Sequence, residues 1–148
     1  MSLQLRITEE LKAAMVARNA DRTGALRLIK SALGYAQIEK KTDNLSDADV
    51  TGVLQKEAKK RTNAISEYTT AGREELAAKE RAELAIIEEF LPKALSPEAL
   101  EALVKAVIAE TGATSKKDMS AVMKATLARA AGQADGKSVS ALVGRLLP

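Results

Sequence analysis

Apolar residues at helical spacing are the feature that most restricts how this 148-residue chain can fold. Leu26, Ile29 and Leu33 recur at intervals of three and four residues, which places them on one face of a helix. The same spacing recurs along the chain, and no stretch alternates apolar and polar residues over the length of a β-branched strand. Alanine, leucine, lysine and glutamate, all strong helix formers, dominate the sequence. We therefore expect an all-α fold.

Capping residues, glycines and prolines mark where each helix should begin and end. A serine or an aspartate precedes five of the seven apolar stripes, and Ser96-Pro97 is the strongest of these start signals, since proline is favoured in the first helical turn. The expected helices span about 4–19, 21–40, 46–72, 73–91, 96–112, 115–132 and 135–146. The expected N-caps are Asp21, Ser46, Ser96, Ser115 and Asp135, with capping-box partners at Asp49 and Asp118.

The segment from Pro92 to Pro97 is the best candidate for a domain boundary, because proline cannot continue a helix. It divides the chain into a four-helix domain, residues 1–92, and a small three-helix tail domain, residues 96–148. A tail of about fifty residues is marginally stable alone. We therefore expect it to pack against its neighbour or a partner.

The chain contains no histidine and no cysteine, which excludes most familiar enzyme chemistry. Ser-His-Asp and Cys-His nucleophilic sites, thiolate or imidazole zinc sites, haem anchors and disulfides all require one of these residues. We expect no catalytic residues, no cofactor and no metal. No apolar run approaches the roughly 20 residues of a membrane span, and the first ten residues do not resemble a signal peptide. A cytoplasmic protein without a membrane partner is the expectation.

Positive charge is concentrated towards the carboxyl end. The net charge of the chain is only +3, but residues 111–148 hold six basic and two acidic residues. The other 110 residues hold 17 basic and 18 acidic ones, which is nearly balanced. At 100° per residue, Lys117 and Lys124 lie almost opposite the apolar face of the sixth helix. On the seventh helix, Lys137 and Arg145 likewise lie away from the apolar residues.

The turn GQADG (132–136) joins the two basic helices and supplies free backbone amides at a helix start, which favours anion binding. Basic helices that meet at such a turn suggest nucleic-acid binding, although two glycines in a turn are also ordinary. The candidate RNA-binding residues are Lys116, Lys117, Lys124, Arg129, Gly132, Gln133, Gly136, Lys137 and Arg145.

Arg61 is the second candidate, within the run KEAKKR (56–61). The run can be a solvated helix face, but the apolar stripe of this helix places Arg61 on its apolar side. A charge there needs a partner, so we favour a structural ion pair over a ligand contact. The acidic residues of the fourth helix interleave with basic ones around its apolar face. They therefore fit an amphipathic surface better than paired catalytic carboxylates or a metal site.

Three segments resemble the YqeY-like proteins, whose architecture is similar to the carboxyl-terminal region of GatB, the B subunit of the tRNA-dependent amidotransferase. These segments are KEAKKR, EYTTAGREELAAKERAELAIIEEFLPKAL and KDMSAVMKATLARAAGQADGKSVSALVGRLL, and DRTGALRLIKSAL near the amino end fits too. The resemblance implies a helical domain followed by a tail that in GatB helps to hold the tRNA body. Ala130, Ala131 and Gln133 depart from it, because the family commonly carries more basic residues there, as does Ser120, where glycine is usual.

The resemblance implies a non-catalytic module that binds tRNA or a partner complex in tRNA metabolism. Amidotransferase subunits or a tRNA-charging complex are the implied protein partners. Two alternatives stay open. One is a non-catalytic component of a glutamine-dependent carbon-nitrogen ligase. In the amidotransferase, glutamine is hydrolysed on another subunit and the kinase-like region belongs to a part of GatB that is absent here, and nothing in this sequence replaces either. The other is a protein-protein interaction adaptor that uses the four-helix part.

Overall fold

In the computed structural model, which describes residues 2–148, every regular element is helical. The helices are α1 (Leu3–Val16), α2 (Ala20–Lys40), α3 (Asp47–Thr70), α4 (Glu74–Glu88), α5 (Pro97–Thr111), α6 (Met119–Ala130) and α7 (Gly136–Leu146). A short 3₁₀ helix, η1 (Lys116–Asp118), precedes α6. The all-α prediction is therefore confirmed for the described residues.

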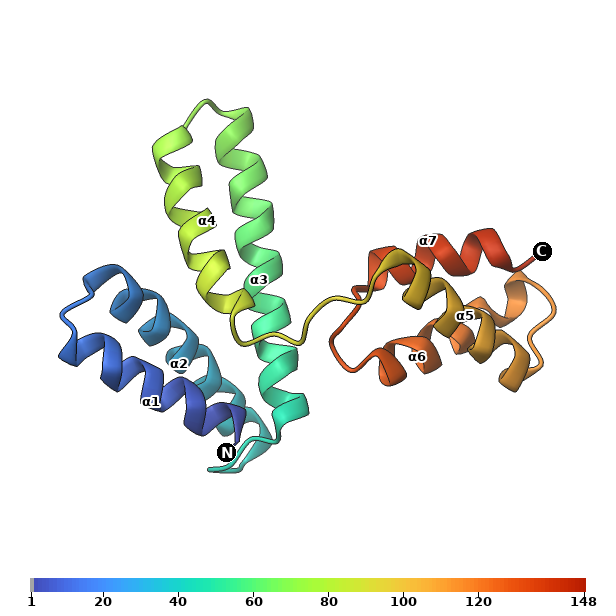
Figure 1. Ribbon diagram of the computed structural model, residues 1–148, viewed down its shortest axis with the longest axis horizontal. Coiled ribbons are helices and arrows are strands. Elements are labelled where there is room, and N and C mark those ends of the chain that lie inside the picture. Colours follow the sequence, from blue (N-terminus) through green and yellow to red (C-terminus); the bar gives the residue numbers. More distant parts are fainter. Residues whose placement is uncertain (1) are drawn as a thin grey trace. The chain divides into compact units, whose positions relative to one another are not determined.

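The chain forms two compact units, which we call unit 1 (Met1–Leu91) and unit 2 (Pro92–Pro148). In unit 1, α1 packs along α2, and α3 pairs with α4 in a long hairpin that diverges from α2 (Figure 1). Its core lies where the two pairs meet. The buried core residues are Ile7, Leu11, Ala14, Leu26, Ile29, Leu33, Leu45, Val50, Leu54, Ile87 and Phe90.

Unit 2 has a separate core, because each of its three helices turns one apolar face towards the other two. Its fully enclosed side chains are mostly valines, whose restricted rotamers lose little entropy on burial. The buried members are Leu100, Val104, Val107, Val122, Val139, Val143 and Leu147. The backbone N–H of Leu95 donates to the carbonyl of Gln133 (2.9 Å), which attaches the segment before α5 to the turn before α7.

Both predicted boundaries between the first and second helices are wrong. We expected Asp21 to cap the second helix, but the side chain of Asn19 accepts the N–H of Arg22 (3.1 Å) and α2 begins at Ala20. The first helix correspondingly ends at Val16 rather than Asn19, because Arg18 adopts a left-handed conformation (φ 57°). A tight turn between α1 and α2 therefore replaces the last turn of the expected helix.

The fourth helix ends at Glu88 instead of Leu91. The N–H of Phe90 donates to the carbonyl of Ile87 (3.0 Å), an i to i−3 bond that tightens the chain at the helix end. Phe90 is only 3% exposed, and the guanidinium of Arg6 lies 5.0 Å from the centre of its ring. Burial of Phe90 in the core thus accompanies the end of α4 before Pro92 is reached.

Candidate functional site

The two acids of the carboxyl-terminal part are used to cap helices. Asp118 accepts the backbone N–H of Thr114 (3.0 Å), and with Ser115 it forms the expected capping box, although around η1 rather than α6. Asp135 caps α7 by accepting the N–H of Ser138 (2.7 Å). Neither carboxylate forms an ion pair with a basic side chain in the described part of the chain. Both therefore leave nearby lysines without a direct partner.

Two of the three glutamates of α5 pair with the two arginines of this unit. Arg129 on α6 forms an ion pair with Glu110, and Nη2 of Arg145 on α7 lies 3.4 Å from Oε1 of Glu101. Glu101 also contacts Lys105 (3.4 Å). These exposed pairs are individually weak, but a phosphate would have to compete with a carboxylate for each arginine.

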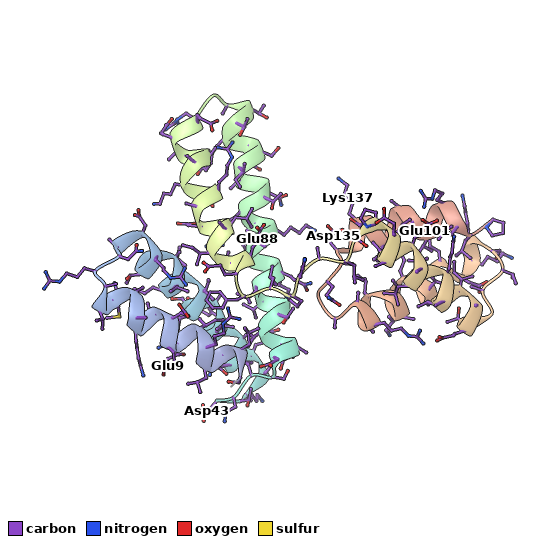
Figure 2. The ribbon with its side chains drawn as sticks, in the orientation of Figure 1. Glu9, Asp43, Glu88, Glu101, Asp135 and Lys137 are labelled. Carbon is purple, nitrogen blue, oxygen red and sulfur yellow. The ribbon has the colours of Figure 1, made fainter. Side chains whose placement is uncertain are left out.

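Unit 2 holds six lysines, of which Lys105 pairs with Glu101 and Lys93 lies before α5, so four lysines lie on η1, α6 and α7. Lys116, Lys117, Lys124 and Lys137 are all exposed, and across residues 2–148 their side chains form neither ion pairs nor hydrogen bonds. Figure 2 shows the side chain of Lys137 extending outward from the start of α7. We call these four residues the lysine set. They lie on η1, α6 and α7, whereas every glutamate of unit 2 lies on α5.

The lysine set is spread along the unit and does not converge on one point. The backbone N–H of Lys116 donates to the carbonyl of Pro148 (3.2 Å), just beyond the end of α7, whereas Lys137 lies in the first turn of the same helix. An eleven-residue helix is about 16 Å long. The set therefore fits successive groups of an extended polyanion better than a single small anion.

The turn before α7 is a weaker anion site than its sequence suggests. The left-handed residues Ala131 (φ 48°) and Gly132 (φ 89°) end α6, and Gly136 is the first residue of α7. A backbone hydrogen bond from Ser138 lowers the pKa of Asp135, and the nearby charge of Lys137 lowers it further. Asp135 is consequently ionised at neutral pH. Its negative charge occupies the helix start that a phosphate would use.

Arg61 forms a buried ion-pair network in unit 1. Arg61 lies on α3, and the residue is 7% exposed. Its Nη1 donates to Oε2 of Glu57 (2.8 Å), one turn earlier, and its Nε lies 3.3 Å from Oε2 of Glu83 on α4. Burial opposes ionisation of Glu57, but hydrogen bonds from Arg61 and Lys60 outweigh it and lower the pKa of Glu57. The network thus joins α3 to α4.

Two features of unit 1 have no signal in the sequence. Arg22 bridges Glu10 (3.0 Å) and Glu89 (2.7 Å), which links α2 to α1 and to the end of α4. A cleft of about 410 Å³ opens between α2 and the α3–α4 hairpin, with Arg61 in its wall. Both depend on how the helix pairs cross. The periodicity of a single helix does not contain that information.

Neither a metal site nor a membrane span is found in the described part of the chain. Residues 2–148 contain no group of three or more acidic side chains placed to hold a metal ion. None of their helices combines the length and the apolar character needed to cross a bilayer.

These observations define a class of protein: a two-unit helical chain with a lysine-bearing unit 2 and a buried ion-pair network in unit 1. The chain belongs to the YqeY-like protein family, whose model matches residues 4–147. An uncharacterized protein of Schizosaccharomyces pombe is 35% identical over 92 residues, which are 62% of this chain and 74% of the relative. Altered inheritance of mitochondria protein 41, mitochondrial, of Vanderwaltozyma polyspora is 30% identical over 87 residues, 59% of this chain. The matched part covers 47% of that second relative.

Proposed function

We propose that this chain is a non-catalytic module that binds folded RNA, with tRNA as the first candidate, through the lysine set of unit 2. The observation that carries the proposal is the segregation of charge within that unit. Four of its five acids cap helices or pair with arginines, and the fifth, Glu98, lies on α5, so the four lysines of η1, α6 and α7 are left to meet phosphates. Phosphate contacts of this kind supply affinity and orientation without reading sequence.

The absence of aromatic residues from unit 2 supports recognition by shape. The three aromatic residues of the chain are Tyr35, Tyr68 and Phe90, and all precede Pro92. Proteins that read unpaired bases usually stack them on aromatic side chains. Unit 2 cannot do so. A folded RNA whose backbone presents phosphates at suitable spacing is therefore a better ligand than a single-stranded segment.

Salt dependence tests this proposal directly. Four phosphate contacts should give a slope of log affinity against log salt of roughly −3 to −4. We expect Lys117→Glu with Lys124→Glu to weaken binding of a purified tRNA strongly and to flatten the slope. Lys56→Glu with Lys59→Glu on α3 is the matched control, since it changes the net charge equally on an exposed surface of unit 1. Equal loss in both double variants, or no salt dependence, would refute a site in unit 2.

Exposed apolar side chains on α2 favour a second candidate function, a protein-protein adaptor. Tyr35 and Ile38 are each 76% exposed, and Leu28 is 49% exposed on the same helix. Large apolar residues left in water commonly mark interaction surfaces when they are contiguous. If this function holds, Tyr35→Ser with Ile38→Ser should abolish a purified complex with a protein partner and leave RNA binding unchanged.

The predicted domains also remain a proposal. We propose that residues 1–92 and 96–148 fold as separate domains, supported by the two distinct cores. The irregular segment between α4 and α5 would then be a linker.

A further inference from the structure

The strongest unassigned feature is the cleft between α2 and the α3–α4 hairpin of unit 1. Its volume is about 410 Å³, which is within the range of small-molecule sites. Its wall includes Leu28 from α2, Arg61 and Ala64 from α3, and Lys79, Glu80 and Glu83 from α4. The cleft therefore combines apolar side chains with charges of both signs.

Arg61 lines this cleft, and one nitrogen of its guanidinium has no hydrogen bond in the described structure. Its Nη1 is bound to Glu57 and its Nε faces Glu83. The remaining nitrogen, Nη2, forms no hydrogen bond within residues 2–148. It is also not among the side-chain atoms that are fully buried without a hydrogen-bond partner, so it is not closed off from solvent. A guanidinium that is otherwise fixed by two carboxylates has lost its rotational freedom. Its free N–H groups are therefore preorganised for an incoming acceptor.

Two further charged groups in the wall have no partner in the described structure. Lys79 and Glu80 are neighbours on α4, and neither forms an ion pair or a side-chain hydrogen bond there. Lys60 also lines the cleft, but it pairs with Glu57 (3.0 Å). The groups open to a ligand are thus Nη2 of Arg61, the ammonium of Lys79 and the carboxylate of Glu80.

This set of groups selects against simple anions. A phosphate at Arg61 would share the cleft with the carboxylates of Glu80 and Glu83, and like charges repel. A ligand with a carboxylate and an ammonium group close together satisfies both signs. Its carboxylate meets Arg61 and Lys79, its ammonium meets Glu80, and an apolar part can lie against Leu28 and Ala64.

We propose that this cleft is a binding site for a small zwitterion with an apolar side chain, that is, a free α-amino acid of aliphatic type. The site lies wholly within unit 1, so it does not depend on RNA binding by unit 2. Because the cleft is open to solvent, the binding is weak, with a dissociation constant on the order of 1 mM.

The test is an NMR titration of the full chain that follows the Nε–H signal of Arg61 and the backbone amides of residues 60–64 and 79–83. The probes are L-leucine, N-acetyl-L-leucine, which lacks the ammonium charge, and L-leucinamide, which lacks the carboxylate. We expect saturable shifts with leucine and at least about fivefold weaker binding of both blocked compounds, since each loses one charged contact. Inorganic phosphate should bind no better than the blocked compounds.

Substitutions of Lys79 and Glu80 in the cleft wall test the proposed site and leave the buried ion-pair network of Arg61 intact. Lys79→Gln and Glu80→Gln should each weaken leucine binding about three- to fivefold, because each removes one partly exposed charge contact. Lys59→Gln, on an exposed position of α3 outside the cleft wall, should leave it unchanged. The proposal is wrong if leucine gives no saturable shift, if the blocked compounds or phosphate bind as well as leucine, or if Lys59→Gln has the same effect as Lys79→Gln.

Discussion

Arg61 shows how one residue holds two helices together. Its guanidinium is shared by Glu57 on α3 and Glu83 on α4, and all three side chains are largely buried. We expect Arg61→Leu to lower the free energy of unfolding by about 3 kcal/mol or more, because two buried carboxylates lose their counter-charge. Combining it with Glu57→Gln and Glu83→Gln should restore most of the loss. Urea denaturation measures both, and a loss below about 1 kcal/mol in the single variant would contradict this role.

The sequence placed Arg61 on an apolar face and indicated one of its two partners, Glu57, but not the other, Glu83. Glu57 lies one helical turn away and could be anticipated from i, i+4 spacing. Glu83 lies 22 positions further along the chain and belongs to another helix. The same limit applies in unit 2, where nothing in the sequence pairs Arg129 with Glu110 or Arg145 with Glu101. Such contacts depend on how helices cross.

The lowered pKa of Glu57 has a consequence for acid stability. A carboxyl group whose pKa is lower in the folded state stabilises the fold above its unfolded pKa, and this contribution is lost as pH falls through the folded value. We therefore expect the free energy of unfolding to decrease below the ordinary Glu value of 4.5. Glu57→Gln should have a flatter profile in that range. Glu67→Gln, an exposed glutamate on the same helix, serves as the control and should follow the wild-type profile.

At the scale of elements, the helix starts were predictable where one capping residue stood alone. Ser46, Ser96 and Asp135 all accept the expected backbone N–H groups. The second helix was misplaced because Asn19 and Asp21 are both good caps, and a left-handed Arg18 decided between them. Tertiary burial of Phe90, rather than Pro92, marks the end of α4. Local chemistry therefore predicts starts better than ends.

The cap of α7 can be separated from its charge by two substitutions. Asp135→Ala removes the acceptor for the N–H of Ser138, so we expect a loss of about 1 kcal/mol in the free energy of unfolding of unit 2. Asp135→Asn keeps an acceptor and should cost only a few tenths of that amount. Hydrogen exchange of the α7 amides distinguishes the two, and equal effects would mean that the charge, not the cap, stabilises the helix.

At the scale of the whole molecule, the separate cores predict that unit 2 folds without unit 1. Residues 92–148 enclose seven apolar side chains of their own, and the hydrogen bond from Leu95 to Gln133 fixes their first residues within the same unit. A domain of this size is marginally stable. We expect the isolated fragment to unfold cooperatively but at lower urea concentration than unit 1. A fragment without a cooperative transition would contradict separate domains.

Binding measurements on the same fragment test RNA binding separately from folding. If the lysine set binds RNA, the isolated unit 2 should show the same slope of log affinity against log salt as the full chain. That slope depends on the number of phosphate contacts and not on the stability of the fold. Residues 1–91 alone should bind the same tRNA more weakly, with a slope nearer zero. If unit 2 is folded but shows no salt-dependent binding, any RNA contact lies outside the lysine set. That result would favour the second candidate function, a protein-protein adaptor that uses the exposed apolar residues of α2.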